Sequence, residues 1–216
     1  MKVLIGGEKG GSSKSTNATN LAVYLAHQGV DVVLLDADPQ GTSARFVERR
    51  NEYNPALPVV HCVQRSGDVS ATIKDLILRY QVVIIDAGGR DSKELRTAMV
   101  VADVFITPIR ASQADLETLP HVNELIALAR SLNPSLEAYA LLSLAPSNPM
   151  IKEVPEAQEM ISQFDQLKLA NSIIRDRKVY RDALAEGRGV VEMNNYLARA
   201  EIQLLGQEFF NITGNQ

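Results

Sequence analysis

Seven short apolar runs rich in Val, Ile and Leu recur along the chain, and they do not alternate apolar with polar residues. Strands of this kind are buried on both faces, which is typical of a parallel sheet. The predicted strands lie at residues 3–5, 32–35, 59–63, 82–85, 104–106, 138–144 and, as the weakest, 167–174.

Helical patterns occupy the stretches between most of these runs. The predicted helices lie at residues 15–27, 70–80, 92–101, 114–131, 152–164 and 192–210. This alternation predicts an α/β fold with a doubly wound, mostly parallel sheet flanked by helices on both faces. A chain of 216 residues suits one such domain with a sizeable core, and no internal repeat or low-complexity linker divides it. We therefore expect a single domain over residues 1–216, with a long loop at "APSNP", residues 145–149.

The charge, the cysteine content and the lack of long apolar runs exclude several classes of function. The net charge is −4, so no overall basic field attracts nucleic acid or anionic lipid, and any such partner needs a local patch. The single cysteine, Cys62, has no partner for a disulfide or a metal cluster, and we interpret it as a buried strand thiol. The chain has no signal-peptide pattern and no apolar run near the roughly 20 residues that cross a bilayer. We expect a cytoplasmic protein that does not bind a membrane.

The loop after the first predicted strand reads "IGGEKGGSSKST", residues 5–16. The common phosphate-binding loop has Gly, four residues, Gly, Lys, then Ser or Thr, and here Glu8 and Ser13 occupy the two glycine positions. The four remaining glycines let backbone N–H groups converge, and the helix that follows points its positive end at the same place. Lys14 supplies a full charge and the Ser15 hydroxyl a ligand for Mg²⁺. The alternative is a tight strand–helix turn with chance basic residues. Nucleotide binding is expected at Gly10, Gly11, Ser12, Ser13, Lys14, Ser15 and Thr16.

Carboxylates follow two other predicted strands. Asp36 and Asp38, in "LLDADPQG", would face the same side if their strand continued, a pair suited to holding Mg²⁺ or orienting water. Asp86 ends the run in "VVIIDAGG", and the glycines behind it leave room for a γ-phosphate. Each carboxylate alone is also explained as a turn former or helix cap. Because ligands of such sheets bind at the carboxyl ends of the strands, we predict that these features form one site with Ser15, Asp36 and Asp86 as metal ligands.

Four segments together resemble the ParA/MinD group of deviant Walker-A ATPases, and most closely the ParA-type DNA-partition ATPases. They are "EKGGSSKSTNATNLA", "VVLLDADPQGTSARF", "VVIIDAGG" and "DVFITPIRASQADL", and a looser match, "IIRDRKVYRDALAEGRGVVE", extends the resemblance to about residue 195. The resemblance implies the P-loop NTPase fold, with ATP and Mg²⁺ as cofactors. Two departures from the family stand out: Ser13 replaces a glycine, and "DAGG" replaces the usual Asp-x-Pro-Pro.

The resemblance also assigns roles to residues. Lys9 matches the signature lysine that reaches the partner subunit's ATP, and Lys14 the lysine that binds its own. Asp38 matches the carboxylate linked to water activation, so that the expected catalytic residues are Lys9, Lys14 and Asp38. Ser15 matches the Mg²⁺ ligand and Asp86 the Walker-B aspartate. Pro108 and Asp115 match a segment near the nucleotide and the dimer interface.

By this resemblance the chain is an ATPase that forms an ATP-bound sandwich homodimer, binds DNA nonspecifically and segregates plasmid or chromosomal DNA from the nucleoid. Without the γ-phosphate the lysine-bearing faces repel one another, so ATP favours the dimer. Slow hydrolysis, stimulated by a ParB-like centromere-binding or adaptor protein, then dissolves it. The alternative within the family is an ATPase that positions a protein assembly on the nucleoid.

A local excess of basic residues supports DNA as the target. Residues 168–199 contain seven basic and four acidic residues, a net charge of +3 within a chain of −4. Arg175, Lys178 and Arg181 are the predicted phosphate contacts. The competing interpretation is a solvated helix face with internal ion pairs. No helix-turn-helix domain precedes the first strand, so operator-specific repression is not expected.

Three further classes are weaker. A membrane switch of the MinD kind needs a basic amphipathic C-terminal helix, and here Glu201 and Glu208 oppose Arg199. A metabolic P-loop enzyme needs bridging cysteines or a substrate pocket, neither of which the sequence indicates. A nucleotide-binding scaffold that has lost hydrolysis is a further alternative, because Ser13 replaces a glycine of the phosphate loop.

Overall fold

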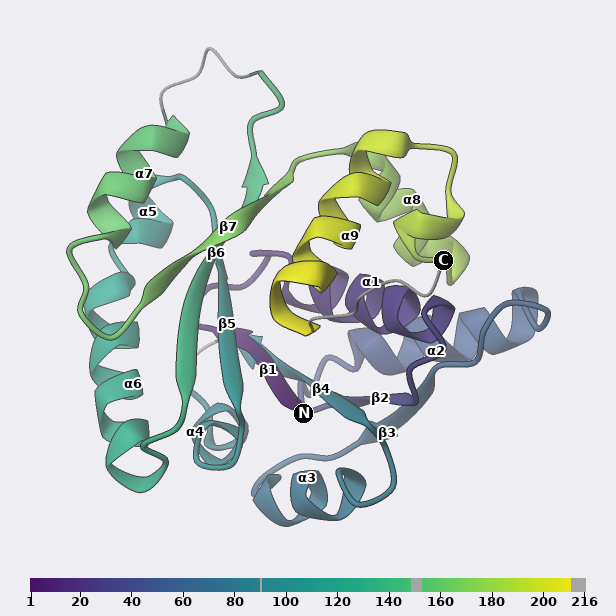
Figure 1. Ribbon diagram of the computed structural model, residues 1–216, viewed down its shortest axis with the longest axis horizontal. Helices are drawn as coiled ribbons and strands as arrows, with labels where there is room; N and C mark the ends of the chain where they lie inside the picture. The colour runs from purple at the N-terminus through teal and green to yellow at the C-terminus, as the bar shows by residue number, and fades with distance from the viewer. Residues whose placement is uncertain (90, 149–152, 211–216) are drawn as a thin grey trace.

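The computed structural model describes residues 1–89, 91–148 and 153–210, and its centre is a seven-stranded sheet (Figure 1). The strand order is β3-β2-β4-β1-β5-β6-β7, and every neighbouring pair is parallel. The strands are β1 (Lys2–Gly7), β2 (Val32–Asp36), β3 (His61–Gln64), β4 (Val82–Gly89), β5 (Val104–Ile109), β6 (Glu137–Ala145) and β7 (Lys168–Arg175). All seven predicted strands are confirmed, and the parallel α/β class with them.

Two helical layers cover the two faces of the sheet (Figure 1). One layer holds α1 (Lys14–His27), α2 (Thr42–Tyr53), α8 (Lys178–Glu186), the short 3-10 helix η1 (Val190–Glu192) and α9 (Tyr196–Phe210). The other holds α3 (Ser70–Leu76), α4 (Lys93–Met99), α5 (Gln113–Leu116), α6 (Leu119–Leu132) and α7 (Glu153–Ile161).

Burial on both faces explains why the strands lack polar alternation. In β1, Leu4 packs into the cluster under α3 to α7, whereas its neighbours Val3 and Ile5 pack into the cluster under α1 and α9. Successive side chains of a strand point to opposite faces, so each face of this sheet requires its own apolar residues.

Several predicted helix limits are wrong. The predicted helix at 114–131 is two helices, α5 and α6, because Thr118 binds the Asp115 carbonyl through its hydroxyl and Pro120 starts a new first turn. The predicted helix at 192–210 begins only at Tyr196, and that at 70–80 ends at Leu76. Helices α2 and α8 were not predicted. Residue 152 of the helix predicted at 152–164, and residue 149 of the predicted loop, lie outside the described residues.

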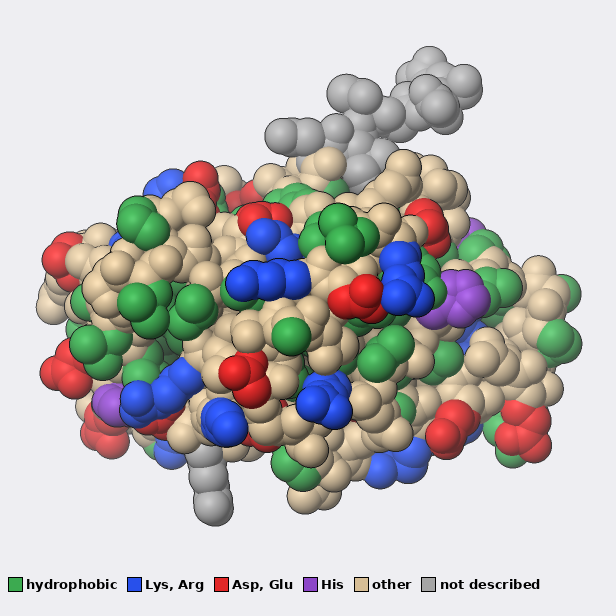
Figure 2. Space-filling model, turned by 90° about the horizontal axis from the view of Figure 1, so that it is seen from below, with side chains coloured by type: hydrophobic (Ala, Val, Ile, Leu, Met, Phe, Trp, Pro, Cys, Tyr) green, Lys and Arg blue, Asp and Glu red, His purple; other side chains and the backbone are tan. Residues whose placement is uncertain are grey.

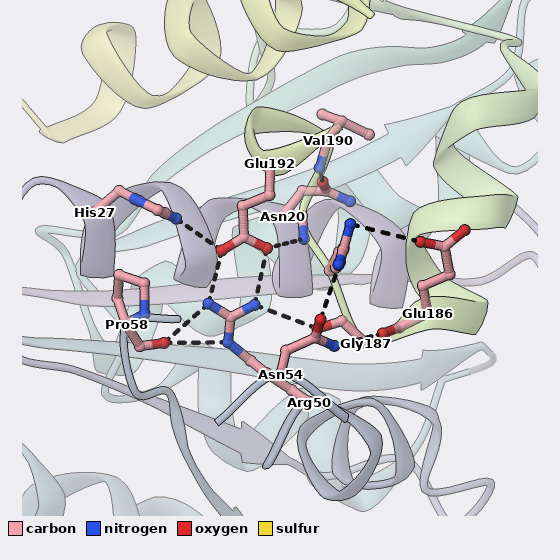
Figure 3. Close-up of polar contacts among 11 residues, drawn as sticks. Asn20, His27, Arg50, Asn54, Pro58, Glu186, Gly187, Val190 and Glu192 are labelled. Carbon is pink, nitrogen blue, oxygen red and sulfur yellow. Dashed lines mark hydrogen bonds and ion pairs between the residues drawn. The ribbon is translucent and has the colours of Figure 1, made fainter. Parts of the chain in front are cut away.

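A buried ion pair fastens the C-terminal segment to the layer of α1 and α2 (Figure 3). Arg50 of α2 is 1% exposed, and its guanidinium binds both carboxylate oxygens of Glu192 at 2.7 and 2.9 Å. The same guanidinium donates to the Pro58 and Gly187 carbonyls, and His27 of α1 contacts Glu192 at 2.7 Å. His27 is the last residue of α1 and Glu192 the last of η1, while Pro58 and Gly187 lie in loops. The cluster therefore ties these ends to Arg50 of α2.

We expect Glu192→Ala to lower the free energy of unfolding by about 3–5 kcal/mol, because it leaves the buried Arg50 guanidinium without its counter-charge. Denaturant unfolding measures the loss. The matched control is Asp75→Ala, which removes the acid of the exposed Arg79 pair and should change stability by about 1 kcal/mol or less. Equal losses in both variants would contradict the role given to Arg50 and Glu192.

The same cluster contributes to acid sensitivity. Burial acts to raise the pKa of Glu192, but hydrogen bonds from Arg50, His27 and the Gly189 N–H outweigh it and hold that pKa below the ordinary 4.5. A carboxyl group with a lowered pKa in the folded state stabilises the fold above its ordinary pKa. This stabilisation is lost as the pH falls below about 4.5.

Candidate nucleotide-binding site

The loop between β1 and α1 has the backbone of an anion-binding site. Gly11 and Ser13 both adopt left-handed conformations, with φ of 73° and 67°, and α1 begins immediately afterwards at Lys14. Alternation of left- and right-handed residues turns successive N–H groups toward one concave side, where an anion binds. The helix N-terminus adds its partial positive charge at that place.

Ser13 is strained, as its replacement of a glycine implied. It is one of two non-glycine residues with positive φ among the described residues, and this region costs a side chain about 1–2 kcal/mol. Its hydroxyl donates to the Ser12 carbonyl at 2.5 Å and accepts from the Asn17 amide at 3.3 Å. Asn17 is fully buried and also donates to Ser143 at 3.1 Å. The serine side chain is therefore held by contacts that a glycine would not make.

These contacts predict an order of stability at position 13. Ser13→Gly should stabilise the chain by up to about 1 kcal/mol, because glycine adopts positive φ freely. Ser13→Ala should destabilise it, because alanine keeps the strain and loses the hydroxyl bound to Asn17. Thermal unfolding of the three proteins measures the order. A Ser13→Gly variant less stable than Ser13→Ala would show that the strain is not the larger effect.

Lys14 is buried beneath this loop, only 6% exposed, and its ammonium donates to the Lys9 carbonyl at 2.5 Å. Burial lowers the pKa of Lys14, while the charges of Asp86, Asp38 and Asp115 oppose that shift. The ammonium therefore places a positive charge directly against the phosphate loop, with three carboxylates near enough to act on its pKa. The side chain of Lys9, in contrast, is exposed.

Asp86 supplies the buried carboxylate of the site. It is fully buried; one oxygen accepts from the Ser43 hydroxyl at 2.7 Å, and the other has no hydrogen-bond partner among the described residues. Burial raises its pKa to about 7, against the effects of the nearby Ser43 and Ser15 hydroxyls. A divalent cation bound by Ser15 and Asp86 would satisfy the free oxygen and restore the ionised carboxylate. The residues present therefore fit Mg²⁺.

The condition under which Asp36 and Asp38 would face the same side, a strand that continues past Asp36, is not met. Strand β2 ends at Asp36, which is 2% exposed, and its two oxygens accept the N–H groups of Asp38 at 3.1 Å and Ala44 at 2.8 Å. Asp36 thus supports the turn into α2. Asp38 lies beyond the strand at the edge of the cleft, where it accepts from the Gln40 N–H at 2.9 Å.

The glycines of "DAGG" lie in close contact with Asp38 and the phosphate loop. Strand β4 does not end at Asp86 but continues to Gly89, which pairs with Gly7. A Cβ at Gly88 would lie 3.1 Å from the Asp38 carboxylate, and one at Gly89 would lie 3.0 Å from the Gly10 nitrogen. A side chain at either position would therefore force Asp38 or the phosphate loop to shift by a few tenths of an ångström.

These elements surround a cleft of about 910 Å³ at the carboxyl ends of the strands. Of the predicted nucleotide-binding residues, Gly10, Gly11, Ser13, Lys14, Ser15 and Thr16 line the cleft, whereas Ser12, Pro108 and Asp115 do not. The cleft-lining residues that the sequence patterns did not indicate are Glu8, Pro39, Gln40, Thr42, Asp91, Ser92, Glu94 and Leu184. Most of them follow β2 or β4 directly, as the rule for ligand sites of such sheets implies; Leu184 comes from α8 and has no sequence signal.

Pro108 lies within β5, whereas Asp115 acts on the phosphate loop from outside the cleft. Asp115 accepts the backbone N–H of Arg110 at 3.1 Å, and the Arg110 guanidinium donates to the Gly11 carbonyl. The segment after β5 therefore supports the phosphate loop through Arg110, a residue that the sequence did not single out.

The predicted DNA contacts lie where β7 leads into α8, and each is engaged within the chain. The Arg175 guanidinium donates to the Pro146 carbonyl at 2.6 Å. Lys178 pairs with Asp182 at 2.9 Å and Arg181 with Asp176 at 2.8 Å. The side chains of Lys178 and Arg181 are 80% and 65% exposed, so both pairs are solvated and weak.

Within the described residues, none of the helices combines the length and apolarity needed to cross a bilayer. Cys62, expected to be buried, is only partly so. Burial is still the main reason that the pKa of its thiol rises to about 12.

Known proteins share both the sequence pattern and the fold. The chain is 34% identical over 113 residues to the protein ParA of Rhizobium radiobacter, a match that covers 52% of this chain and 50% of that protein. It is 27% identical over 201 residues to the maintenance of carboxysome distribution protein A of Gloeobacter kilaueensis, covering 88% and 84%. The solved structure of apo McdA from Cyanothece superposes with a TM-score of 0.79 at 19% identity, covering 96% and 98%.

The family model described as ATPase MipZ matches residues 1–140, which is more than half of the chain. This segment includes the phosphate loop, Asp38, Asp86 and the segment after β5. The resemblance to ParA-type ATPases is thereby confirmed, and the chain belongs to the MipZ family of ATPases within the ParA/MinD group.

Proposed function

We propose that this chain binds ATP with Mg²⁺ in the cleft and hydrolyses it as the switch of a partition or positioning cycle. The observation that carries the proposal is that Lys14, Ser15 and the left-handed phosphate loop line one cleft, with the buried Asp86 carboxylate directly behind Ser15 and Lys14. Lys14 and the loop N–H groups would hold the phosphates, and Ser15 and Asp86 would hold the metal. When bound, Mg²⁺ supplies charge to the transferred phosphoryl group. Asp38 lines the same cleft and would orient the attacking water.

The dimer is part of the same proposal. The exposed Lys9 sits next to Gly89 on the rim of the cleft, where a second subunit can meet it. With ATP bound, the phosphates attract the partner's Lys9 side chain, and without them the two lysine-bearing faces repel. Hydrolysis, slow in the chain alone and stimulated by an adaptor or a ParB-like protein, would then release the dimer.

Sedimentation with ATP and with ADP tests this function directly. We expect ATP to convert monomers into dimers and ADP to leave them monomeric. Nonspecific DNA added to the ATP sample should co-sediment with the dimer. ATP binding without any change of oligomeric state would contradict the switch.

Nonspecific DNA binding at α8 is proposed for Lys178 and Arg181. Their partners are exposed acids that contribute about 1 kcal/mol or less, so exchanging them for DNA phosphates is feasible. Arg175, bound to the Pro146 carbonyl, is less available. On the face that carries α3 and α4, seen from below in Figure 2, basic and acidic side chains are interspersed, so that face does not compete as a basic surface.

We expect Arg181→Glu to abolish DNA binding while ATP-dependent dimerisation persists, because it places a carboxylate beside Asp176 in the proposed interface. Fluorescence anisotropy with labelled DNA at two salt concentrations measures the loss. Arg79→Glu, the same change at an exposed, paired arginine just after α3, is the matched control and should bind DNA normally. If the two variants bind DNA equally, the interface lies elsewhere.

The cargo is a separate question, and a second candidate has support. The match to the carboxysome distribution protein covers 88% of this chain, and the McdA structure superposes over 96% of it. These matches favour a protein assembly on the nucleoid as cargo, alongside plasmid or chromosomal DNA. Purification of the ATP-bound protein's partner distinguishes the two: a centromere-binding protein supports DNA cargo, and a cluster-forming adaptor supports a protein assembly.

A further inference from the structure

His121, the third residue of α6, faces the rim of the nucleotide cleft. Its Nε2 lies 3.0 Å from the Glu8 carboxylate of the phosphate loop and 3.7 Å from the Asp91 carboxylate after β4. Its Nδ1 lies 3.9 Å from Glu124, one turn further along α6. The imidazole is 46% exposed and is therefore open to solvent protons. One side chain thus bridges the two loops on either side of the phosphate position.

The groups around this imidazole are predominantly acidic. Glu8 and Asp91 both line the cleft, so two carboxylates lie where a polyanion must enter. Hydrogen bonds and charge from Arg96, with a smaller contribution from His121, hold the pKa of Asp91 below its ordinary value despite partial burial. Among the described residues, the charged groups at the imidazole are Glu8, Asp91 and Glu124, and Arg96 pairs with the same Asp91 oxygen.

We propose that His121 is a positioning residue for nucleotide binding: its protonated imidazole ties the phosphate loop to the β4–α4 loop and offsets the carboxylates at the rim. This rests on the proposed binding of ATP in the cleft. The protonated ring donates toward Glu8 through Nε2, faces Glu124 through Nδ1 and carries the positive charge that the two rim carboxylates require. The neutral ring keeps one N–H and loses the charge. Glu8 then repels the phosphates, and the two loops are held less firmly.

The pH dependence follows from this arrangement. The protonated ring offsets the rim carboxylates and the neutral ring does not, so the effect of His121→Gln on ATP affinity is compared at two pH values, pH 6 and pH 8. Asp86 and the nucleotide phosphates also titrate in this range. The quantity to compare is therefore the ratio of the ATP affinities of His121→Gln and the wild type at the same pH. The protonation of Asp86 and of the nucleotide affects both proteins equally and cancels in this ratio.

The experiment is calorimetric titration of the folded chain with Mg-ATP at pH 6 and pH 8. The proteins are the wild type, His121→Gln, Glu8→Gln, the double variant and His61→Gln, which alters an exposed histidine of β3 outside the cleft. We expect His121→Gln to weaken binding about two- to fivefold at pH 6, the range of a partly exposed ion pair, and less at pH 8. In the Glu8→Gln background the His121→Gln effect should shrink, because the carboxylate that it offsets is gone. His61→Gln should match the wild type.

Two results would overturn the role of His121. The first is equal affinity of His121→Gln and the wild type at both pH values. The second is a loss at His121→Gln that is the same at both pH values and unaffected by Glu8→Gln, which a purely structural contact would produce. Failure of the wild type to bind Mg-ATP would instead overturn the proposed function, so the two failures are distinct.

Discussion

Replacing Lys14 with alanine is expected to abolish measurable ATP binding while the chain remains folded. The ammonium is 6% exposed and now binds the Lys9 carbonyl, which a phosphate would replace as its partner. Truncating one member of a buried, hydrogen-bonded charge pair costs about 3 kcal/mol or more, which is a hundredfold or greater loss of affinity. Calorimetric titration with Mg-ATP measures the loss.

Two controls separate this effect from unfolding. Lys14→Met keeps the length and the apolar part of the side chain and should lose ATP binding equally. Lys93→Ala, a change at another lysine near the cleft, should bind ATP like the wild type. Unchanged affinity in a folded Lys14→Ala variant would refute the assignment of the phosphate loop.

Replacing Asp38 with alanine is expected to stop hydrolysis while ATP binding survives. Asp38 contacts neither the Lys14 ammonium nor the Asp86 carboxylate through any hydrogen bond among the described residues, and it lies at the cleft edge beside Gly88. Loss of a group that positions or activates water lowers turnover by about 10²–10⁴-fold. The ATP-bound dimer should therefore persist on DNA, which steady-state phosphate release and sedimentation measure together.

The exposed Asp31, between α1 and β2, provides the matched control. Asp31→Ala removes a carboxylate of the same kind outside the cleft and should hydrolyse ATP at the wild-type rate. Normal turnover in Asp38→Ala would exclude its proposed part in hydrolysis. Loss of ATP affinity in that variant would instead show that Asp38 holds the nucleotide.

The phosphate loop shows which features of a site a local sequence pattern can predict. The order Lys-Gly-Gly, then Lys14 and Ser15, indicated a nucleotide site because the spacing of these residues is itself the geometry of the loop. The strain at Ser13 could also be anticipated, since the position requires φ that glycine favours. The hydrogen bonds that hold the Ser13 hydroxyl through Asn17 could not be anticipated. Asn17 is itself bound to Ser143 of β6, more than a hundred residues away.

Asp36 shows the limit of a strand-based prediction. The alternation rule puts residues i and i+2 on one side only while the strand continues, and β2 stops at Asp36. The turn that follows is decided by where α2 packs, and that helix was not predicted. Asp36 therefore supports the backbone of Ala44, and Asp38 alone reaches the cleft.

Amino-acid order was sufficient for the parallel sheet and for the phosphate loop at a strand end, because each depends on residues adjacent in the chain. Three features needed the folded chain: the approach of Gly88 and Gly89 to Asp38 and the loop, the Arg50–Glu192 pair, and His121 between Glu8 and Asp91. Each joins residues that are distant in sequence, and the packing of separate helices and strands sets the distances between them. No local periodicity encodes those distances.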